Sequence, residues 1–428
     1  MILALLNNSY VLIILTSLLV VFSYLFSALS RRTRIPSVLM LLITGIVARI
    51  AFDRMGYTLD YLQTVLEFFG IIGLILIVLE GALDLRMERK KLGLLFRSFL
   101  SALVILVVSA LSIAKVMQLF YPDFTYYVCL INAIPLAVIS SAIAIPSVQG
   151  IEEDKKEFII YESIFSDILG ILFFNTVISN PEFTSSTLAW LGIDFLIVTA
   201  VSIILTGLIL LFIDKTTMNI KFFLLIAILV LLYAFGKMIH LSSLLMILIF
   251  GIILNNLDLI GKSKLGKFIH SDTIATGVDQ FRIITNESAF LIRTLFFFIF
   301  GFTLQFVVFT EPRIIITGTL VVALLFIIRY LYLKFLARRN LFPELFIAPR
   351  GLITILLFYS IPAEYSQGII SEGVLFFVIL ITSLVMMFGL MKSTKKIPEM
   401  EIYADDMLSR LHPDHPENNQ DDEQTGLK

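Results

Sequence analysis

Apolar runs long enough to cross a membrane recur along the chain, and they constrain its fold more than any other feature. A transmembrane helix needs about 20 predominantly apolar residues. Such runs predict about thirteen helices, near residues 9–30, 36–52, 62–84, 92–121, 126–148, 157–179, 186–213, 219–238, 241–256, 287–309, 313–333, 344–362 and 371–391. Of the 428 residues, 58% are hydrophobic and only 15% are charged, which is unlike a soluble globule. We therefore predict an all-α polytopic membrane protein.

Basic residues in the connections alternate between the two sides of the predicted membrane. One side holds most of the Lys and Arg, whereas the other holds only Arg54, Lys237 and Arg313. Cytoplasmic loops retain basic residues. The asymmetry predicts an N-terminus outside the cell (inner) membrane, a cytoplasmic C-terminus and an odd number of spans.

Composition and motifs exclude several function classes. The formal net charge is -1, so nothing attracts nucleic acid. The only cysteine, Cys129, cannot form an internal disulfide or a multi-cysteine metal site. The GxGxxG, GxSxG and HExxH motifs are absent, as is a phosphate-binding loop. We expect no enzyme activity, no cofactor and no nucleotide-binding domain.

An internal repeat indicates the architecture. Residues 35–50 (IPSVLMLLITGIVARI) and 241–256 (LSSLLMILIFGIILNN) share Ser, Leu, Met, Leu, Ile, Gly and Ile at matching positions. They fall in the second and ninth predicted spans, which cross the membrane in opposite directions. LEGALDL at 79–85 and FGFTLQF at 300–306 correspond in the same order. The sequence thus predicts two inverted repeats.

The domain organisation follows from this repeat. Residues 1–392 form the predicted transmembrane domain, with repeat one near 9–179 and repeat two near 219–392. Residues 257–286 are mixed apolar and basic, which favours a linker helix at the cytoplasmic interface. Residues 393–428 are polar and acidic, which predicts a short disordered cytoplasmic tail.

Prolines mark the fifth and twelfth spans of the two repeats. The fifth contains Pro135 and Pro146, and the twelfth contains Pro349 and Pro362. Proline removes a backbone donor and clashes with the preceding turn, so we expect both spans to be interrupted, although Pro146 and Pro362 could simply cap helix ends. Interrupted helices at corresponding places in inverted halves are typical of a secondary transporter with its substrate site near the membrane midplane.

The sixth span carries the best candidate for that site. Its sequence YESIFSDILG places Glu162 four residues before Ser166, and Ser163 four residues before Asp167. Each pair lies on one helix face, and hard oxygens suit a small monovalent cation or a proton relay. Asp167 lies deep in the span, whereas Glu162 could lie near the interface.

Other charges inside predicted spans need partners. Arg350, between Pro349 and Gly351, could bind freed carbonyls and Glu162. Arg293 could hold Glu162 or Glu80, or extend to the interface. Glu80 could also be shallow, but we count it with Asp167 among the candidate ion- and proton-binding residues. We expect Arg329, like Arg97, to extend from a helix end to the interface.

These residues resemble the monovalent cation/proton antiporter family, in the branch whose sixth span reads Glu-Ser-x-x-Asn-Asp. The resemblance rests on ESIFSD at 162–167, LEGALDL at 79–85, the prolines of the fifth span, TLFFFIFGFTL at 294–304 and PRGLIT at 349–354, and it covers residues 10–392. It implies that Asp167 binds Na+ or Li+ and H+ in competition, that Glu162 pairs with an Arg, and that the protein is a homodimer working by an elevator-like movement.

The chain departs from the family pattern at two places. Ser166 replaces the usual Asn or Asp, which resembles the electroneutral, one-for-one branch. Ala144-Ile145-Pro146 replaces the family's Thr-Asp-Pro, so Ser140, Ser141 and Ser163 would supply the hydroxyls of the site. The ion preference among Na+, Li+ and K+ stays open.

Two other functions remain open at this stage. The same fold could serve an organic-anion/cation symporter that binds its substrate through Arg350 and Arg293. A non-transporting membrane sensor or an intramembrane enzyme would belong to another class, but none of the searched catalytic motifs supports it.

Overall fold

The computed structural model describes residues 9–33, 35–54, 62–85, 91–148, 151–180, 200–204, 206–207, 222–238, 243–256, 271–303, 311–338, 341–366, 368 and 370–393. All regular secondary structure in these ranges is helical. The predicted all-α fold is therefore confirmed over the described residues. Within the same ranges, five helical stretches are both long and apolar enough to cross a membrane, and four shorter apolar helices accompany them.

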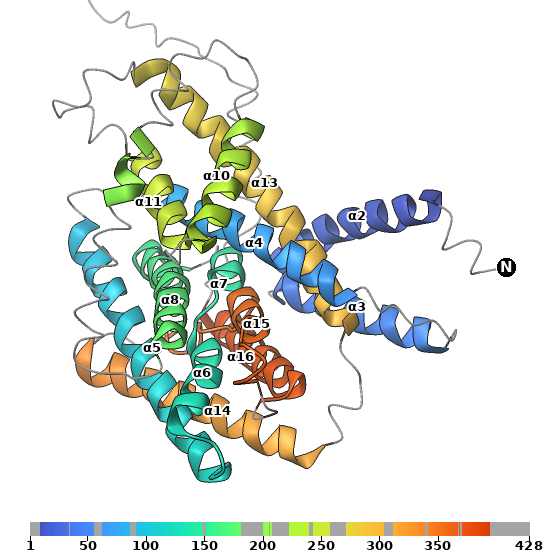
Figure 1. Ribbon diagram of the computed structural model, residues 1–428, viewed down its shortest axis with the longest axis vertical. Helices are drawn as coiled ribbons and strands as arrows, with labels where there is room; N and C mark the ends of the chain where they lie inside the picture. Colours follow the sequence, from blue (N-terminus) through green and yellow to red (C-terminus); the bar gives the residue numbers. More distant parts are fainter. Residues whose placement is uncertain are drawn as a thin grey trace, which may run out of the picture.

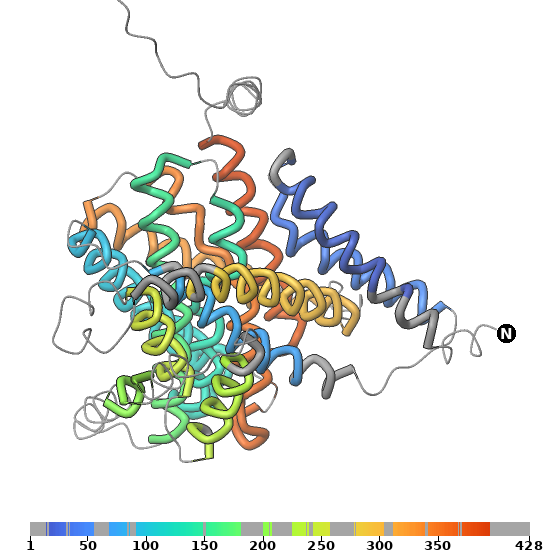
Figure 2. The backbone as a smooth tube through the Cα atoms, turned by 90° about the horizontal axis from the view of Figure 1, so that it is seen from above, coloured from blue at the N-terminus to red at the C-terminus, as the bar shows by residue number. Residues whose placement is uncertain are grey.

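The helices form two packing groups. The first, called the α13 group, contains α2 (Ser9–Thr33), α3 (Ser37–Arg54), α4 (Leu62–Asp84), α10 (Phe222–Met238), α11 (Ser243–Asn255) and α13 (Ser271–Thr303). Helix α13 packs along α3 and α4, and α4 also packs on α11. In Figures 1 and 2 the α2–α3 pair stands at one end of the molecule, away from α5 and α14.

The second group contains the two interrupted spans and is called the crossing group. Its members are α5 (Leu92–Phe120), α6 (Tyr126–Ala137), α7 (Ser141–Ser147), α8 (Glu153–Ser179), α14 (Pro312–Leu331), the π-helix η4 (Tyr332–Leu336), α15 (Leu352–Tyr359) and α16 (Glu372–Ser393). Helix α5 packs on α6 and α8, and α14 packs on α16. Helices α4 and α11 join the two groups through contacts with α8.

Helix bounds mostly agree with the apolar runs, and one difference concerns the predicted linker. Residues 271–286, which were expected to be part of an interfacial linker helix, are the first half of the continuous helix α13. The rest of that linker lies outside the described residues. So do most of the seventh predicted span, 186–213, and the tail 393–428 beyond Ser393.

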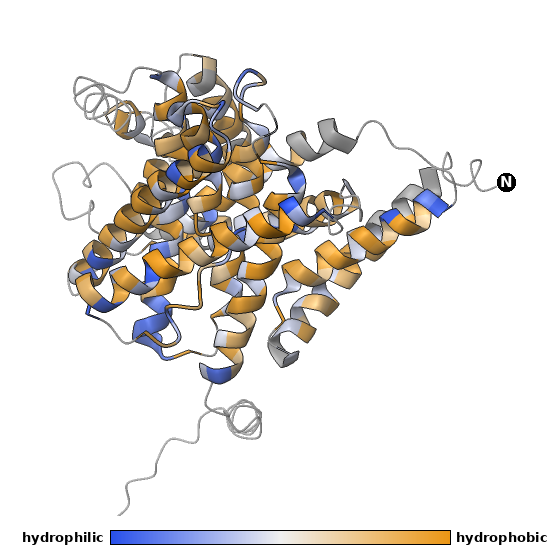
Figure 3. Cartoon of the chain, turned by 90° about the horizontal axis from the view of Figure 1, so that it is seen from below, coloured by the Kyte–Doolittle hydropathy of each residue, from blue (hydrophilic) through white to orange (hydrophobic). Residues whose placement is uncertain are grey.

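The outward surface of the helices is apolar (Figure 3). Large side chains such as Leu111, Ile316, Ile327 and Phe388 are exposed to the surroundings of the chain. In a bilayer such residues contact lipid, which supplies no hydrogen bonds, so the backbone polar groups are satisfied within each helix.

Small residues bring helices of the α13 group into close contact. A Cβ atom at Gly45 of α3 would lie 2.3 Å from the carbonyl oxygen of Phe298 in α13, and one at Gly251 of α11 would lie 2.5 Å from the Cβ of Ala82 in α4. Membrane helices pack closely through such residues, because lipid provides no hydrophobic drive for helix association.

Candidate functional site

Two interrupted segments cross at the centre of the crossing group. Helix α6 ends at Ala137, residues 138–140 are extended, and α7 begins at Ser141. The backbone N–H of Ser140 donates to the carbonyl of Pro349, in the non-helical segment before α15, at 2.8 Å. A Cβ atom at Gly351 would lie only 2.6 Å from the Oγ of Ser140. The two predicted interruptions therefore lie in direct contact.

The first break falls between Pro135 and Pro146, both of which lie inside helical segments. Each N–H at the break has a new partner. Besides the Ser140 bond to Pro349, the N–H of Ile139 donates to Ser166 Oγ at 2.9 Å, and the N–H of Ser141 donates to Asp167 Oδ2 at 3.0 Å. The side chains of α8 thus satisfy backbone groups that the break leaves without helical partners.

Asp167 is the carboxylate at this break. It is buried, with 3% of its surface exposed. Its Oδ2 accepts the bond from the backbone N–H of Ser141. Its Oδ1 is buried and has no hydrogen-bond partner among the described residues. One oxygen is held by the protein while the other stays available.

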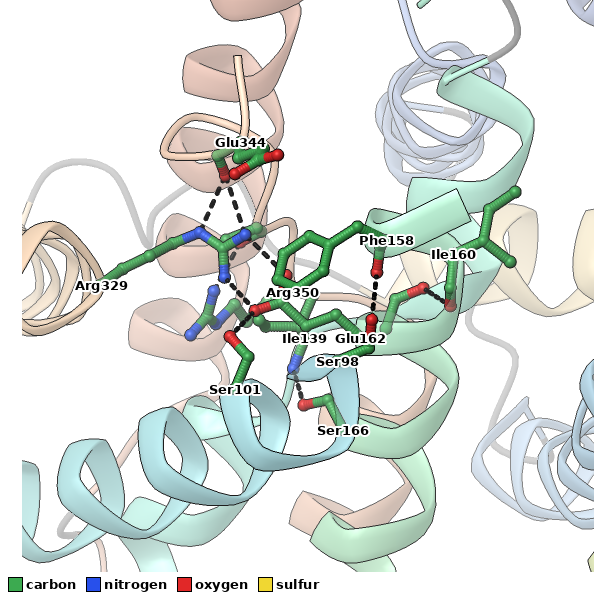
Figure 4. A network of polar contacts seen from close by, with 12 residues as sticks. Ser98, Ser101, Ile139, Phe158, Ile160, Glu162, Ser166, Arg329, Glu344 and Arg350 are labelled. Carbon is green, nitrogen blue, oxygen red and sulfur yellow. Dashed lines mark hydrogen bonds and ion pairs between the residues drawn. The ribbon is translucent and has the colours of Figure 1, made fainter. Parts of the chain in front are cut away.

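The three other serines of the predicted site differ in what their hydroxyls do. Ser166 accepts from Ile139, as above, and Ser163 donates to the carbonyl of Ile160 at 2.9 Å (Figure 4). Ser140 is fully buried, and its Oγ has no partner within the described part of the chain. Asp167 and Ser140 therefore both present an unsatisfied buried oxygen at the crossing.

Arg350 binds carbonyls of the crossing, and within the described part of the chain it forms no bond to a carboxylate. Its Nε donates to the carbonyl of Leu136 at 3.0 Å, its Nη2 donates to that of Ala137 at 3.2 Å, and its Nη1 donates to that of Ala348. The guanidinium lies at the C-terminal end of α6, where helix carbonyls carry partial negative charge. The carboxylate of Asp167, a residue of α8, lies at the N-terminal end of α7, where the helix N–H groups carry partial positive charge. Each half-helix thus ends against a charge of the complementary sign.

Glu162 pairs with Arg329, which differs from the predicted pairing with Arg350 or Arg293. The contact is bidentate, with Nη1–Oε1 at 3.1 Å and Nη2–Oε2 at 2.7 Å, and both side chains are only 1% exposed. The Ser101 hydroxyl donates to Glu162 at 2.6 Å, and the carbonyl of Glu344 accepts from Arg329 at 2.8 and 3.0 Å (Figure 4).

The expectation that Arg329 extends to the interface was wrong. Helical structure continues past it through η4 to Leu336, so Arg329 lies inside the span rather than at its end. The continuing apolar sequence after Arg329 could have indicated this. A second signal was the spacing of Ser98, Ser101 and Ser109 in α5, which places polar groups on one buried face.

Glu80 and Arg293 form a second ion pair, which is one of the two pairings considered for Arg293. Arg293 Nη2 lies 2.7 Å from Glu80 Oε2, and the side chains are 11% and 18% exposed. Arg293 Nη1 also donates to the carbonyl of Ala142 in α7 at 3.1 Å. This pair belongs to the α13 group, and its bond to Ala142 reaches the crossing group beside Ser141.

Comparison with known proteins shows what the chain is. A family model described as "Sodium/hydrogen exchanger, transmembrane" matches residues 17–394. The chain belongs to this family. Its members are transporters rather than enzymes, use no cofactor and take cations and protons as substrates. The chain is therefore a multi-pass integral membrane protein of the cation/proton antiporter class.

Solved structures agree on the fold. The chain resembles the sodium proton antiporter MjNhaP1 from Methanocaldococcus jannaschii at pH 8, with a TM-score of 0.63 and 18% identity over 89% of this chain and 98% of that one. A second structure of MjNhaP1, from an electron microscopy map, gives a TM-score of 0.61 and 20% identity over 95% and 100% of the two chains. No curated protein matches the sequence.

Proposed function

We propose that this exchanger carries Na+, Li+ or K+ against H+ by alternating access, and that one carboxylate, Asp167, binds the cation and the proton in competition. The buried Oδ1 of Asp167, which has no partner among the described residues, carries this proposal. A buried carboxylate oxygen without a donor is expensive to keep. A cation or a proton at that oxygen would remove the cost.

The competition couples the two fluxes. With either a proton or a monovalent cation bound, the Asp167 carboxylate is neutralised and can pass the apolar barrier. When it is empty and charged, desolvation opposes its movement. A single exchanging carboxylate supports one-for-one, electroneutral exchange. Ser166 stands next to it, at the position where the resembled family usually has Asn or Asp.

The neighbouring oxygens would complete the cation's surroundings. Ser140 contributes a buried hydroxyl with no partner in the described structure, and carbonyls near the interrupted segments are further hard ligands. Ser141 lies at the start of α7, where its N–H holds Asp167, and Ser163 lies one helical turn before Asp167 in α8. We propose these three serines, together with Ser166, as the polar lining of the site.

The packing of the helices supports two inverted repeats, near 9–179 and 219–392. Helix α3 packs on α13 much as α11 packs on α4, and α5 packs on α8 as α14 packs on α16. Gly45 and Gly251, which correspond in the repeat, both lie at close helix contacts. Movement of the crossing group against the α13 group would open the site to each side in turn.

We propose a homodimer in the inner membrane, with the N-terminus outside and the C-terminus in the cytoplasm. Loop charges support the orientation. The alternative function, an organic-anion symporter, loses support because both arginines that would bind the anion already bind groups of the protein. Arg350 binds three carbonyls, and Arg293 binds Glu80 and Ala142.

The test is exchange by the purified protein in liposomes that contain a pH dye. Addition of Na+, Li+ or K+ should move protons, and the order of response gives the ion preference. Asp167→Asn should abolish the signal while keeping a monodisperse protein. Asp154→Asn is the matched control, because Asp154 is an exposed aspartate in the first turn of the same helix.

Three results would contradict the proposal. Exchange that persists in Asp167→Asn excludes Asp167 as the exchanging group. A wild-type protein that responds to none of the three cations excludes them as substrates. A rate that depends on an imposed membrane potential would exclude electroneutral exchange.

A further inference from the structure

The Glu80–Arg293 pair connects the two helix groups at the point where Asp167 is held. Arg293 lies on α13 and Glu80 on α4, both in the α13 group. The second bond of Arg293 goes to the carbonyl of Ala142 in the crossing group, at 3.1 Å. Ala142 directly follows Ser141, whose N–H binds Asp167 Oδ2 at 3.0 Å.

We infer that Arg293, held by Glu80, is a positioning residue that sets the affinity of Asp167 for its cation. The inference rests on the proposed role of Asp167. The bond to Ala142 places the guanidinium beside Ser141, the residue whose backbone N–H holds the Asp167 carboxylate. The Arg293 guanidinium is positively charged, like the transported cation, so it opposes cation binding. The negative charge of Glu80 offsets this effect.

Burial makes the effect of these charges large. The two side chains are 11% and 18% exposed, and in such surroundings salt and water screen charges much less than at a surface. Loss of one member changes the net charge beside the site by one unit. Removal of Arg293 leaves a negative charge, and removal of Glu80 leaves a positive one.

The two single substitutions should therefore act in opposite directions. Arg293→Gln should lower the KM for the cation about tenfold, and Glu80→Gln should raise it about tenfold. The double variant should return the KM to within about threefold of wild type, because it removes both charges. Arg293→Lys keeps the positive charge and should also stay within about threefold.

The experiment measures cation KM and maximal rate in liposomes at alkaline pH, where protons compete little. Cation binding to the purified variants by calorimetry gives a second readout that does not depend on turnover. Arg97→Gln, which removes an exposed arginine of α5, controls for the loss of one positive charge elsewhere.

A purely structural role predicts a different pattern. If the pair only holds helices together, both single variants lose maximal rate, and any KM shifts have the same sign. That pattern, or no shift in either variant, would overturn the inference. Failure of the proposed function is recognised separately, because it appears as exchange that persists in Asp167→Asn.

Discussion

Arg329→Met should strongly destabilise the protein, because it leaves Glu162 buried without its counter-ion. Both side chains are 1% exposed, and the pair is bidentate. Breaking a buried pair by removing one partner costs about 3–5 kcal/mol. The Ser101 hydroxyl still donates to Glu162, which offsets about 1 kcal/mol. The difference between these two figures gives an expected loss of about 3 kcal/mol in the free energy of unfolding.

Reversible unfolding in mixed micelles, followed by circular dichroism, measures this loss. Arg313→Met is the matched control, since Arg313 is an exposed arginine of the same helix and should have little effect. The double variant Glu162→Met/Arg329→Met should be more stable than Arg329→Met, because it removes the unpaired charge. Equal stability of Arg329→Met and Arg313→Met, or a double variant that is worse than the single one, would refute the reasoning.

Two further predictions concern the crossing and the proton. Gly351→Ala should reduce exchange and the yield of folded protein, because its Cβ would lie 2.6 Å from Ser140 Oγ. Gly93→Ala is the control, since a Cβ there meets open space and the variant should behave as wild type. Normal exchange by Gly351→Ala would contradict the expectation that the two segments must stay in contact. Under the proposed competition at Asp167, the apparent KM for the cation should rise up to tenfold per unit fall in pH in the acidic range at constant maximal rate. A series of exchange rates at several pH values checks this, and a pH-independent KM would exclude competition.

Much of the fold could be predicted because the bilayer is a simple constraint. Apolar length locates helices such as α4, whose bounds, Leu62–Asp84, coincide with the predicted run 62–84. The same argument placed Asp167 far from a helix end, where a charged side chain is costly in lipid and therefore indicates a function. These predictions depend only on local composition and on the cost of placing polar groups in lipid.

Partners of the buried charges could not be predicted in the same way. The sequence offers several arginines that could pair with Glu162. The one that does so, Arg329, lies 167 residues away in sequence. The predicted span 313–333 stopped short of Leu336, where η4 ends, so Arg329 was expected near a helix end.

What the sequence by itself determined is a chain of apolar helices with two proline-marked spans and a few buried charges, because lipid penalises every other arrangement. Only the tertiary structure decided that Arg329 neutralises Glu162, that Arg350 binds helix carbonyls, and that one oxygen of Asp167 stays without a partner in the described structure. The reason is physical. Hydrogen bonds and ion pairs act over about 3 Å, so they depend on which helices pack together, and packing is a property of the whole chain.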